Sequence, residues 1–272
     1  MTVFPDPISV EPSTIQAAIA ALDPKTGVML TVTSAVSWFI STLSGGGSSL
    51  LIIPFIGVIL GAKTIAPVTT IGALLGNGDR VVAYRHHVRW DVVAWEMPGA
   101  IVGSFLGAFV LTHISVRFVT LTVGICLLSS ALSFFWKSWR SIIPTTTPVF
   151  TQTWYFLPAG VLYGFLSGVI GSIGPVLAPI YLAYGLEKQE LLGTQAATRM
   201  AIHLVKVGVY SVFGILNTNY ILYGFILGLA ALPGNWLGHH VLLNISEQLF
   251  RRVAMFFVLF SGLLMVGQNV VM

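Results

Sequence analysis

A series of long apolar segments, separated by short polar ones, constrains this sequence more than any other feature. Hydrophobic residues make up 56% of the chain and charged residues only 8%, whereas a soluble domain carries about 25% charged residues. Segments of roughly 20 apolar residues match a membrane-crossing helix and are too long for the roughly 10-residue strands of an outer-membrane barrel. The sequence therefore predicts an all-α polytopic membrane protein.

The expected membrane segments form two series. In the first half they are Gly27–Leu43, Ser48–Leu60, Thr64–Tyr84, Val92–Thr112 and Val116–Trp136, and in the second half Trp154–Ser167, Val176–Tyr184, Leu191–Leu216, Tyr220–Leu243 and Leu249–Gly267. The second segment of each series is too short to cross the roughly 30 Å apolar core of a bilayer, so we expect it to be a broken or re-entrant helix. With these two, the chain has eight to ten membrane segments.

A glycine-rich break precedes each short helix. Leu43–Pro54 reads LSGGGSSLLIIP and Leu166–Pro179 reads LSGVIGSIGPVLAP. Superposing their final prolines places Gly46 on Gly171. Interrupted apolar helices at matching places in two halves are typical of the binding site of a transporter.

The chain therefore divides into an N-terminal tail outside the membrane (1–26), a first transmembrane repeat (27–136), a linker (137–153) and a second repeat (154–272). Basic residues mark cytoplasmic loops. Arg85 and Arg89 lie one crossing earlier in the first half than Arg251 and Arg252 do in the second. This shift favours inverted repeats of five segments each, with both termini outside, and leaves parallel repeats with eight crossings as the alternative.

A break inside a membrane exposes the N-terminus of the following short helix, where free N–H groups and the positive end of the helix dipole attract anions. Glycine allows a ligand to approach the backbone, and serine adds a hydroxyl donor. The candidate anion-binding residues are Gly45, Gly46, Gly47, Ser48 and Ser49 at the first break, and Gly171, Ser172 and Gly174 at the second. Close helix packing is the alternative role for small residues, and we favour it for the Gly99–Gly107 and Gly160–Gly164 patterns.

A polar stripe runs along one face of the expected helix Leu191–Leu216. It consists of Gln195, Arg199, His203, Lys206 and Tyr210, spaced three or four residues apart. Buried cations are unfavourable in a membrane and need anionic partners. The partner is either an anionic substrate or the carboxylates of Asp79 and Glu96. His203 is either a buried hydrogen-bonding residue or a group that couples transport to protons.

The matching helix of the first half carries fewer polar residues. Thr70 and Asn77 share one of its faces, while Thr69 and Thr194 occupy equivalent places in the two halves and could face the breaks. All four are candidate substrate-binding residues, with hydrogen bonding within the helix as the alternative. Arg80 is equally consistent with a surface anchor and with an anion entry point.

Other functional classes find little support. Cys126 stands alone, and the pairs His86–His87 and His239–His240 are adjacent in sequence, which is poor spacing for a metal site. The sequence shows no catalytic motif and no basic patch with interleaved aromatic residues. We therefore expect no enzyme, no cofactor, no metal and no nucleic-acid partner.

The duplicated break, GGGSSLLIIP and then GSIGPVLAP, resembles the sulfite exporter TauE/SafE family. The stretches Ala66–Thr70 and Gly193–Gln195 and the Gly99–Gly107 pattern add to the resemblance, which spans roughly Gly27 to Gly267. It implies a permease that moves sulfite, organosulfonates or similar small anions, usually outward, across a prokaryotic cell membrane.

We therefore expect a secondary transporter that binds a small sulfur-containing anion near the membrane midplane and works by alternating access. An uncoupled anion channel and a membrane scaffold with an internally paired polar stripe are the alternatives. The expected partners are the anion and the bilayer. A homodimer is a further possible assembly.

Overall fold

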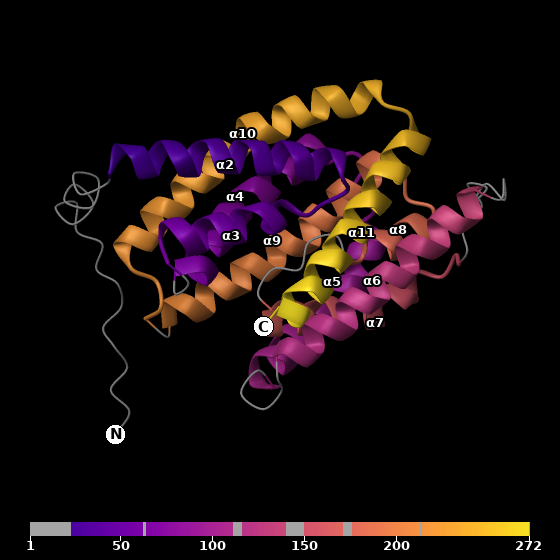
Figure 1. The fold of residues 1–272 in the computed structure, drawn as a ribbon, viewed down its shortest axis with the longest axis horizontal. Helices are drawn as coiled ribbons and strands as arrows, with labels where there is room; N and C mark the ends of the chain where they lie inside the picture. Colours follow the sequence, from indigo (N-terminus) through magenta and orange to yellow (C-terminus); the bar gives the residue numbers. More distant parts are fainter. Residues whose placement is uncertain are drawn as a thin grey trace.

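The computed structural model describes residues 23–61, 64–110, 116–139, 150–170, 176–212 and 214–271, and every regular element in these ranges is a helix (Figure 1). The first half contains α2 (Pro24–Leu43), α3 (Ser48–Ile59), α4 (Ile65–Ala83), α5 (Trp90–Val110) and α6 (Val116–Trp139). The second half contains a 3-10 turn, η2 (Thr153–Tyr155), then α7 (Phe156–Ile170), α8 (Ala178–Tyr184), α9 (Lys188–Val212), α10 (Thr218–Asn244) and α11 (Glu247–Val271).

The helix boundaries differ from the predicted ones for local reasons. α2 begins three residues early because the Asp23 carboxylate accepts hydrogen bonds from the backbone N–H groups of Lys25 and Thr26. Hydrogen bonds from Thr26 also lower the pKa of Asp23. The predicted extension of α9 to Leu216 is wrong. The helix ends at Val212, and Gly214 has a left-handed φ of +64°. α6 continues to Trp139, three residues past the predicted end at Trp136.

The first predicted break is present. Gly45, Gly46 and Gly47 have φ angles of 70°, 121° and 109°, a region that favours glycine, and α3 starts immediately after them. The backbone N–H of Gly46 donates to the Ser41 carbonyl, which helps to close the end of α2. The second break, with Gly171, Ser172 and Gly174, lies outside the described residues.

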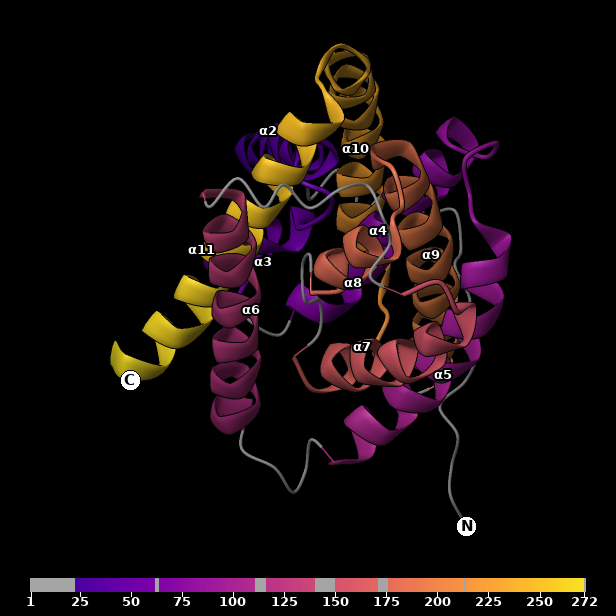
Figure 2. The ribbon, with the colours of Figure 1, turned by 90° about the vertical axis from the view of Figure 1, so that its right-hand side faces the viewer.

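A glycine seam joins α5 to α7 across the two halves. It consists of Gly99, Gly103 and Gly107 on α5 and Gly160 and Gly164 on α7, and a Cβ atom at any of the five would overlap a backbone oxygen of the other helix. The prediction that these glycines serve close packing is confirmed. The matching pair, α2 and α10, also packs closely, with Gly234 against the backbone of Ala35 (Figures 1 and 2).

The two largest hydrophobic cores among the described residues do not follow the two halves of the sequence. α2, α3, α4 and α10 share a smaller core that includes Leu30, Trp38 and Leu227. Residues mainly from α5 to α9 and α11 share the larger core, which includes Phe156 and Leu191. Each half therefore contributes at least one helix to the core of the other.

α4 and α9 lie side by side and run in opposite directions. Thr70 near the start of α4 is a hydrogen-bonding neighbour of Tyr210 near the end of α9. In the middle, Gly78 approaches the Met200 sulfur, and beyond the end of α4 the Arg89 N–H donates to the Thr194 hydroxyl. The two helices thus face each other as an antiparallel pair.

Apolar side chains cover much of the outer surface. Among the described residues, α2 and α10 have the length and hydropathy of membrane-crossing helices. Their outward faces expose Val32 and Leu229, and α5 and α11 expose Phe105 and Phe256 in the same way. Exposed apolar area of this extent is typical of a surface that contacts lipid.

Candidate functional site

The first break lies directly against the polar stripe on α9. A Cβ atom on Gly46 would lie 3.0 Å from Nη1 of Arg199 and 3.1 Å from Oε1 of Gln195. Because Gly46 has no side chain, the guanidinium and the amide can both reach the backbone of the break. The structure therefore brings together three of the residues that the sequence placed in one site.

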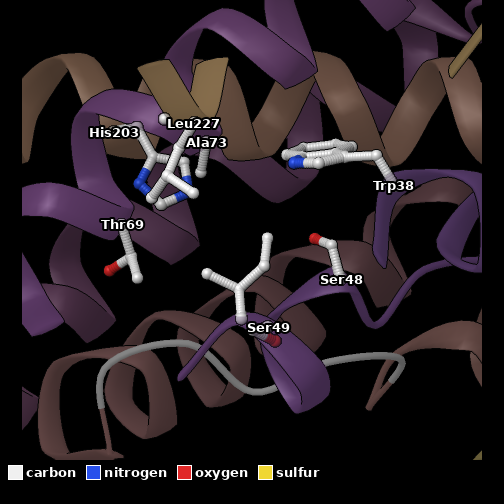
Figure 3. Close-up of a pocket in the computed structure, with 9 residues that line it drawn as sticks. Trp38, Ser48, Ser49, Thr69, Ala73, His203 and Leu227 are labelled. Carbon is white, nitrogen blue, oxygen red and sulfur yellow. The ribbon is translucent and has the colours of Figure 1, made fainter. Parts of the chain in front are cut away.

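Two small cavities flank this contact. One, of about 20 Å³, is lined by residues from the break, α4, α7 and α9: Gly47, Ser48, Ser49, Ala73, Asn77, Tyr163, Arg199 and His203. The other, of about 30 Å³, shares Ser48, Ser49, Ala73 and His203 with the first and adds Trp38, Ile52, Thr69, Gly72 and Leu227. In Figure 3, Ser48 and Trp38 lie opposite His203 and Thr69 across this second cavity.

The start of α3 points its backbone donors into this region. Gly47, in the left-handed conformation, is the N-cap residue and has no side chain with which to cap the helix. Ser48 and Ser49, the first two residues of the helix, line both cavities. A helix N-terminus of this kind is a favourable place for an anion.

Several buried polar groups near the break lack a partner among the described residues. Gln195 is 3% exposed, and neither its amide nitrogen nor its amide oxygen has a hydrogen bond there. The same is true of Nδ1 of His203 and of the Ser41 hydroxyl. An unpaired buried polar group costs about 1–3 kcal/mol, so this concentration is unfavourable for stability alone.

A buried acid also interacts with Arg199. Glu96 on α5 accepts a hydrogen bond from the Tyr181 hydroxyl and interacts electrostatically with Arg199. The Arg199 guanidinium also lies 5.7 Å from the centre of the Tyr163 ring. Asp79, the other acid expected to pair with the polar stripe, instead accepts a 3.0 Å hydrogen bond from Asn235.

The model of the family described as sulfite exporter TauE/SafE matches residues 30–265. The chain belongs to this family. No curated protein and no solved structure matches it. Membership of the TauE/SafE family makes the chain a transmembrane transporter of the sulfite-exporter type.

The remaining predicted residues of this TauE/SafE protein differ in whether they line the two cavities. Asn77 and Thr69 line the cavities but bond to carbonyls within their own helix. Thr70 lies beside Tyr210. The Thr194 hydroxyl accepts a hydrogen bond from the backbone N–H of Arg89, and it therefore contacts the loop after α4.

Lys206 lies farther along the stripe. Its Nζ atom donates a 2.9 Å hydrogen bond to the Ser167 hydroxyl near the end of α7. It therefore contacts the helix that leads to the second break and does not line either cavity of the first.

Arg80 is buried in this TauE/SafE protein, with 2% of its surface exposed. It donates to Asn235 and Thr42 and lies 4.7 Å from the centre of the Trp38 ring. The interpretation as a surface anchor is therefore wrong. Sequence reasoning missed Asn235, although an asparagine in the middle of an apolar helix is a signal of buried hydrogen bonding.

Tyr163 and Trp38 were also not singled out as site residues from the sequence. Both line cavities at the break, yet each sits in an apolar helix where aromatic residues are common.

Proposed function

We propose that this protein is a secondary transporter that exports small sulfur-containing anions such as sulfite or organosulfonates. The observation that carries this proposal is the contact of the Gly46 backbone with Arg199 and Gln195 in the protein interior. This contact joins a positive charge, an amide that has no partner among the described residues, and the N-terminus of α3. The combination suits an anion better than a cation or a neutral molecule.

The chemistry of a sulfonate fits these donors. Its sulfur carries three outward oxygens, which can accept from the N–H groups at Ser48 and Ser49, from the Arg199 guanidinium and from the Gln195 amide. The Ser48 hydroxyl and His203 are further donors at the cavity wall. The cavities hold only one or two water-sized groups, so binding a sulfonate requires their walls to move apart.

We assign the opposite wall of the site to the second break, from the repeat in the sequence. Gly171, Ser172 and Gly174 would supply the second set of backbone donors. Lys206, which bonds to Ser167 on the helix leading to this break, would supply the second positive charge. The outer part of the proposed site consists of Thr69, Thr70, Asn77 and Thr194. Of these, Thr194 contacts the loop after α4 through its hydrogen bond from Arg89.

The proposed mechanism is alternating access between two inverted repeats, residues 27–136 and 154–272, in a prokaryotic cell membrane. Two contact patterns support it. The first helix of each half packs on the fourth helix of the other half, as α2 on α10 and α7 on α5. The antiparallel pairing of α4 with α9, which occupy equivalent places in the two halves, is what an axis in the membrane plane produces.

Flux of sulfite and sulfoacetate through proteoliposomes tests this function. We expect Arg199→Ala to weaken anion affinity about 10- to 100-fold, because it removes a charge-assisted hydrogen bond of about 1.5–3 kcal/mol. Arg252→Ala, at an exposed arginine, is the matched control. No flux of either anion in folded wild-type protein would contradict the proposed substrate class.

Two other results separate the alternatives. Flux that never exceeds the equilibrium set by the anion gradient, whatever other gradient is applied, indicates an anion channel. A membrane scaffold predicts that Arg199→Ala lowers stability and that neither protein carries anions.

A further inference from the structure

Glu96 is a carboxyl group in an unusual place for a structural residue. It is 2% exposed and lies in the second turn of α5, six residues after Trp90, the first residue of the helix. The backbone of Gly160 on α7 contacts the backbone of Glu96 through the glycine seam, which keeps water out on that side. None of the salt bridges among the described residues involves Glu96.

The titratable and charged groups that face Glu96 come from three helices. Tyr181 on α8 donates a hydrogen bond to it, and Tyr163 on α7 and Arg199 on α9 interact with it electrostatically. Thr198 on α9 is a further hydrogen-bonding neighbour without charge. The two tyrosines are neutral near pH 7, so Arg199 is the cation among these groups that can balance an ionised Glu96.

Arg199 therefore interacts with two sites for negative charge. One is Glu96, and the other is the Gly46 backbone with the start of α3. One guanidinium balances one negative charge. When an anion occupies the break, an ionised Glu96 becomes a second, uncompensated charge in the interior, which is strongly unfavourable.

We propose that Glu96 is a proton-binding site whose occupancy is coupled to anion binding through their shared partner, Arg199. This rests on the proposed function. The carboxylate takes a proton from water when the anion binds and returns it to water when the anion leaves, so anion and proton cross together. Export then proceeds where the outward anion gradient exceeds the inward proton gradient. By linkage the coupling is reciprocal: protonation of Glu96 tightens anion binding by the same factor by which the anion tightens proton binding.

The geometry favours Glu96 over His203 as the proton site. His203 lies one turn beyond Arg199 on α9 and lines both cavities. It would gain a positive charge on protonation, beside Arg199 and Lys206, both of which interact with it unfavourably in that form. Protonation of Glu96 removes its negative charge. A bound anion favours this change, because it competes with the carboxylate for the positive charge of Arg199.

Proton uptake on anion binding is the direct test. We would add sulfoacetate, which does not titrate near neutral pH, to weakly buffered detergent-solubilised protein containing a pH dye. We expect wild type to take up on the order of one proton per bound anion and Glu96→Gln, which mimics the protonated acid, to take up none. Glu187→Gln, at an exposed acid in the loop before α9, should behave like wild type.

Transport gives the second readout. In proteoliposomes with the membrane potential clamped at zero, a pH gradient should drive accumulation by wild type but not by Glu96→Gln. Exchange of labelled for unlabelled anion should stay within about threefold of wild type in that variant, because its binding site is intact.

The outcomes separate this inference from the proposed function. Wild-type flux without proton uptake overturns the role of Glu96 and leaves the transporter assignment in place. Accumulation by Glu96→Gln in response to a pH gradient overturns it equally. If Glu96→Gln does not fold, the wild-type proton uptake still decides, and Glu96→Asp, which keeps the acid, should retain it. Absence of any anion flux in wild type contradicts the proposed function itself.

Discussion

Arg80 on α4 donates a 2.9 Å hydrogen bond from Nε to the side-chain oxygen of Asn235 on α10, 155 positions away in the chain. The amide nitrogen of Asn235 in turn donates to the Gly76 carbonyl and the Asp79 carboxylate. One buried asparagine thus satisfies a cation, a carbonyl and an acid at once, and it fixes α4 against α10.

Replacement of this asparagine tests the network. We expect Asn235→Leu to lower the free energy of unfolding by about 1.5–3 kcal/mol, because Arg80 then keeps its charge in the interior and loses an acceptor. Thermal unfolding in detergent measures the change. Asn244→Leu, at an exposed position in the same helix, should change stability by less than about 0.5 kcal/mol. Equal effects of the two substitutions would contradict the assigned role.

Substitution of Gly46 tests the contact between the first break and the polar stripe. Gly46→Ala adds a methyl group 3.0 Å from the Arg199 guanidinium, in a backbone conformation with φ of +121°. We expect sulfoacetate flux to fall by about tenfold or more, since displacing the charged group weakens anion binding.

Gly61→Ala is the control for backbone strain. Gly61 has a comparable φ of +92°, and a Cβ atom there has no neighbour within 4 Å. Both variants should lose a similar amount of stability, about 1–2 kcal/mol for a non-glycine residue in this conformation. A similar loss of flux in both would show that strain, not displacement of Arg199, is responsible.

Gln195 offers a separate test of substrate binding. We expect Gln195→Leu to leave thermal stability unchanged or raised, because it removes two buried polar atoms that have no partner among the described residues. Anion affinity should nevertheless fall about 3- to 10-fold, the effect of losing one neutral hydrogen bond to the ligand. Gln189→Leu, two turns earlier on α9, should alter neither. A stability loss in Gln195→Leu with normal affinity would assign the amide to the fold.

The glycine seam predicts a large loss of stability. We expect Gly164→Ala to destabilise the protein by about 1–3 kcal/mol or more, since the added Cβ meets the backbone of Ala100 and α7 must move away from α5. Gly208→Ala is the control, because a Cβ there meets nothing within 4 Å, and the change should stabilise α9 by up to about 1 kcal/mol. Unfolding temperatures of the two variants should therefore move in opposite directions.

Local chemistry accounts for what the sequence predicted well. Three consecutive glycines before Ser48 can only interrupt a helix, and four-residue spacing from Gly99 to Gly107 can only place glycine on one face. The three- and four-residue spacing of the polar stripe likewise placed Arg199 and Gln195 together. These inferences need nothing beyond the geometry of a single helix.

Contacts between distant segments account for what was missed. Nothing near Arg80 in the sequence indicates that its partner is Asn235, so the arginine could equally be an anchor or an entry point. The choice between Asp79 and Glu96 as the acid near the stripe also depended on which helices pack on α9. Asp79 turned out to belong to the network of Asn235, whereas Glu96 faces Arg199.

The exchange of helices between the two halves affects how the protein can be divided. α7 lies on α5 of the first half, and α2 lies on α10 of the second, so each polypeptide half is incomplete without the other. A chain cut between α6 and η2 should yield two fragments that assemble only when they are produced together. Neither fragment is expected to be stable alone, because each would lose the close helix packing of α7 on α5 and of α10 on α2. During synthesis, α2 and α5 therefore remain without their partner helices until α7 and α10 have been translated and inserted.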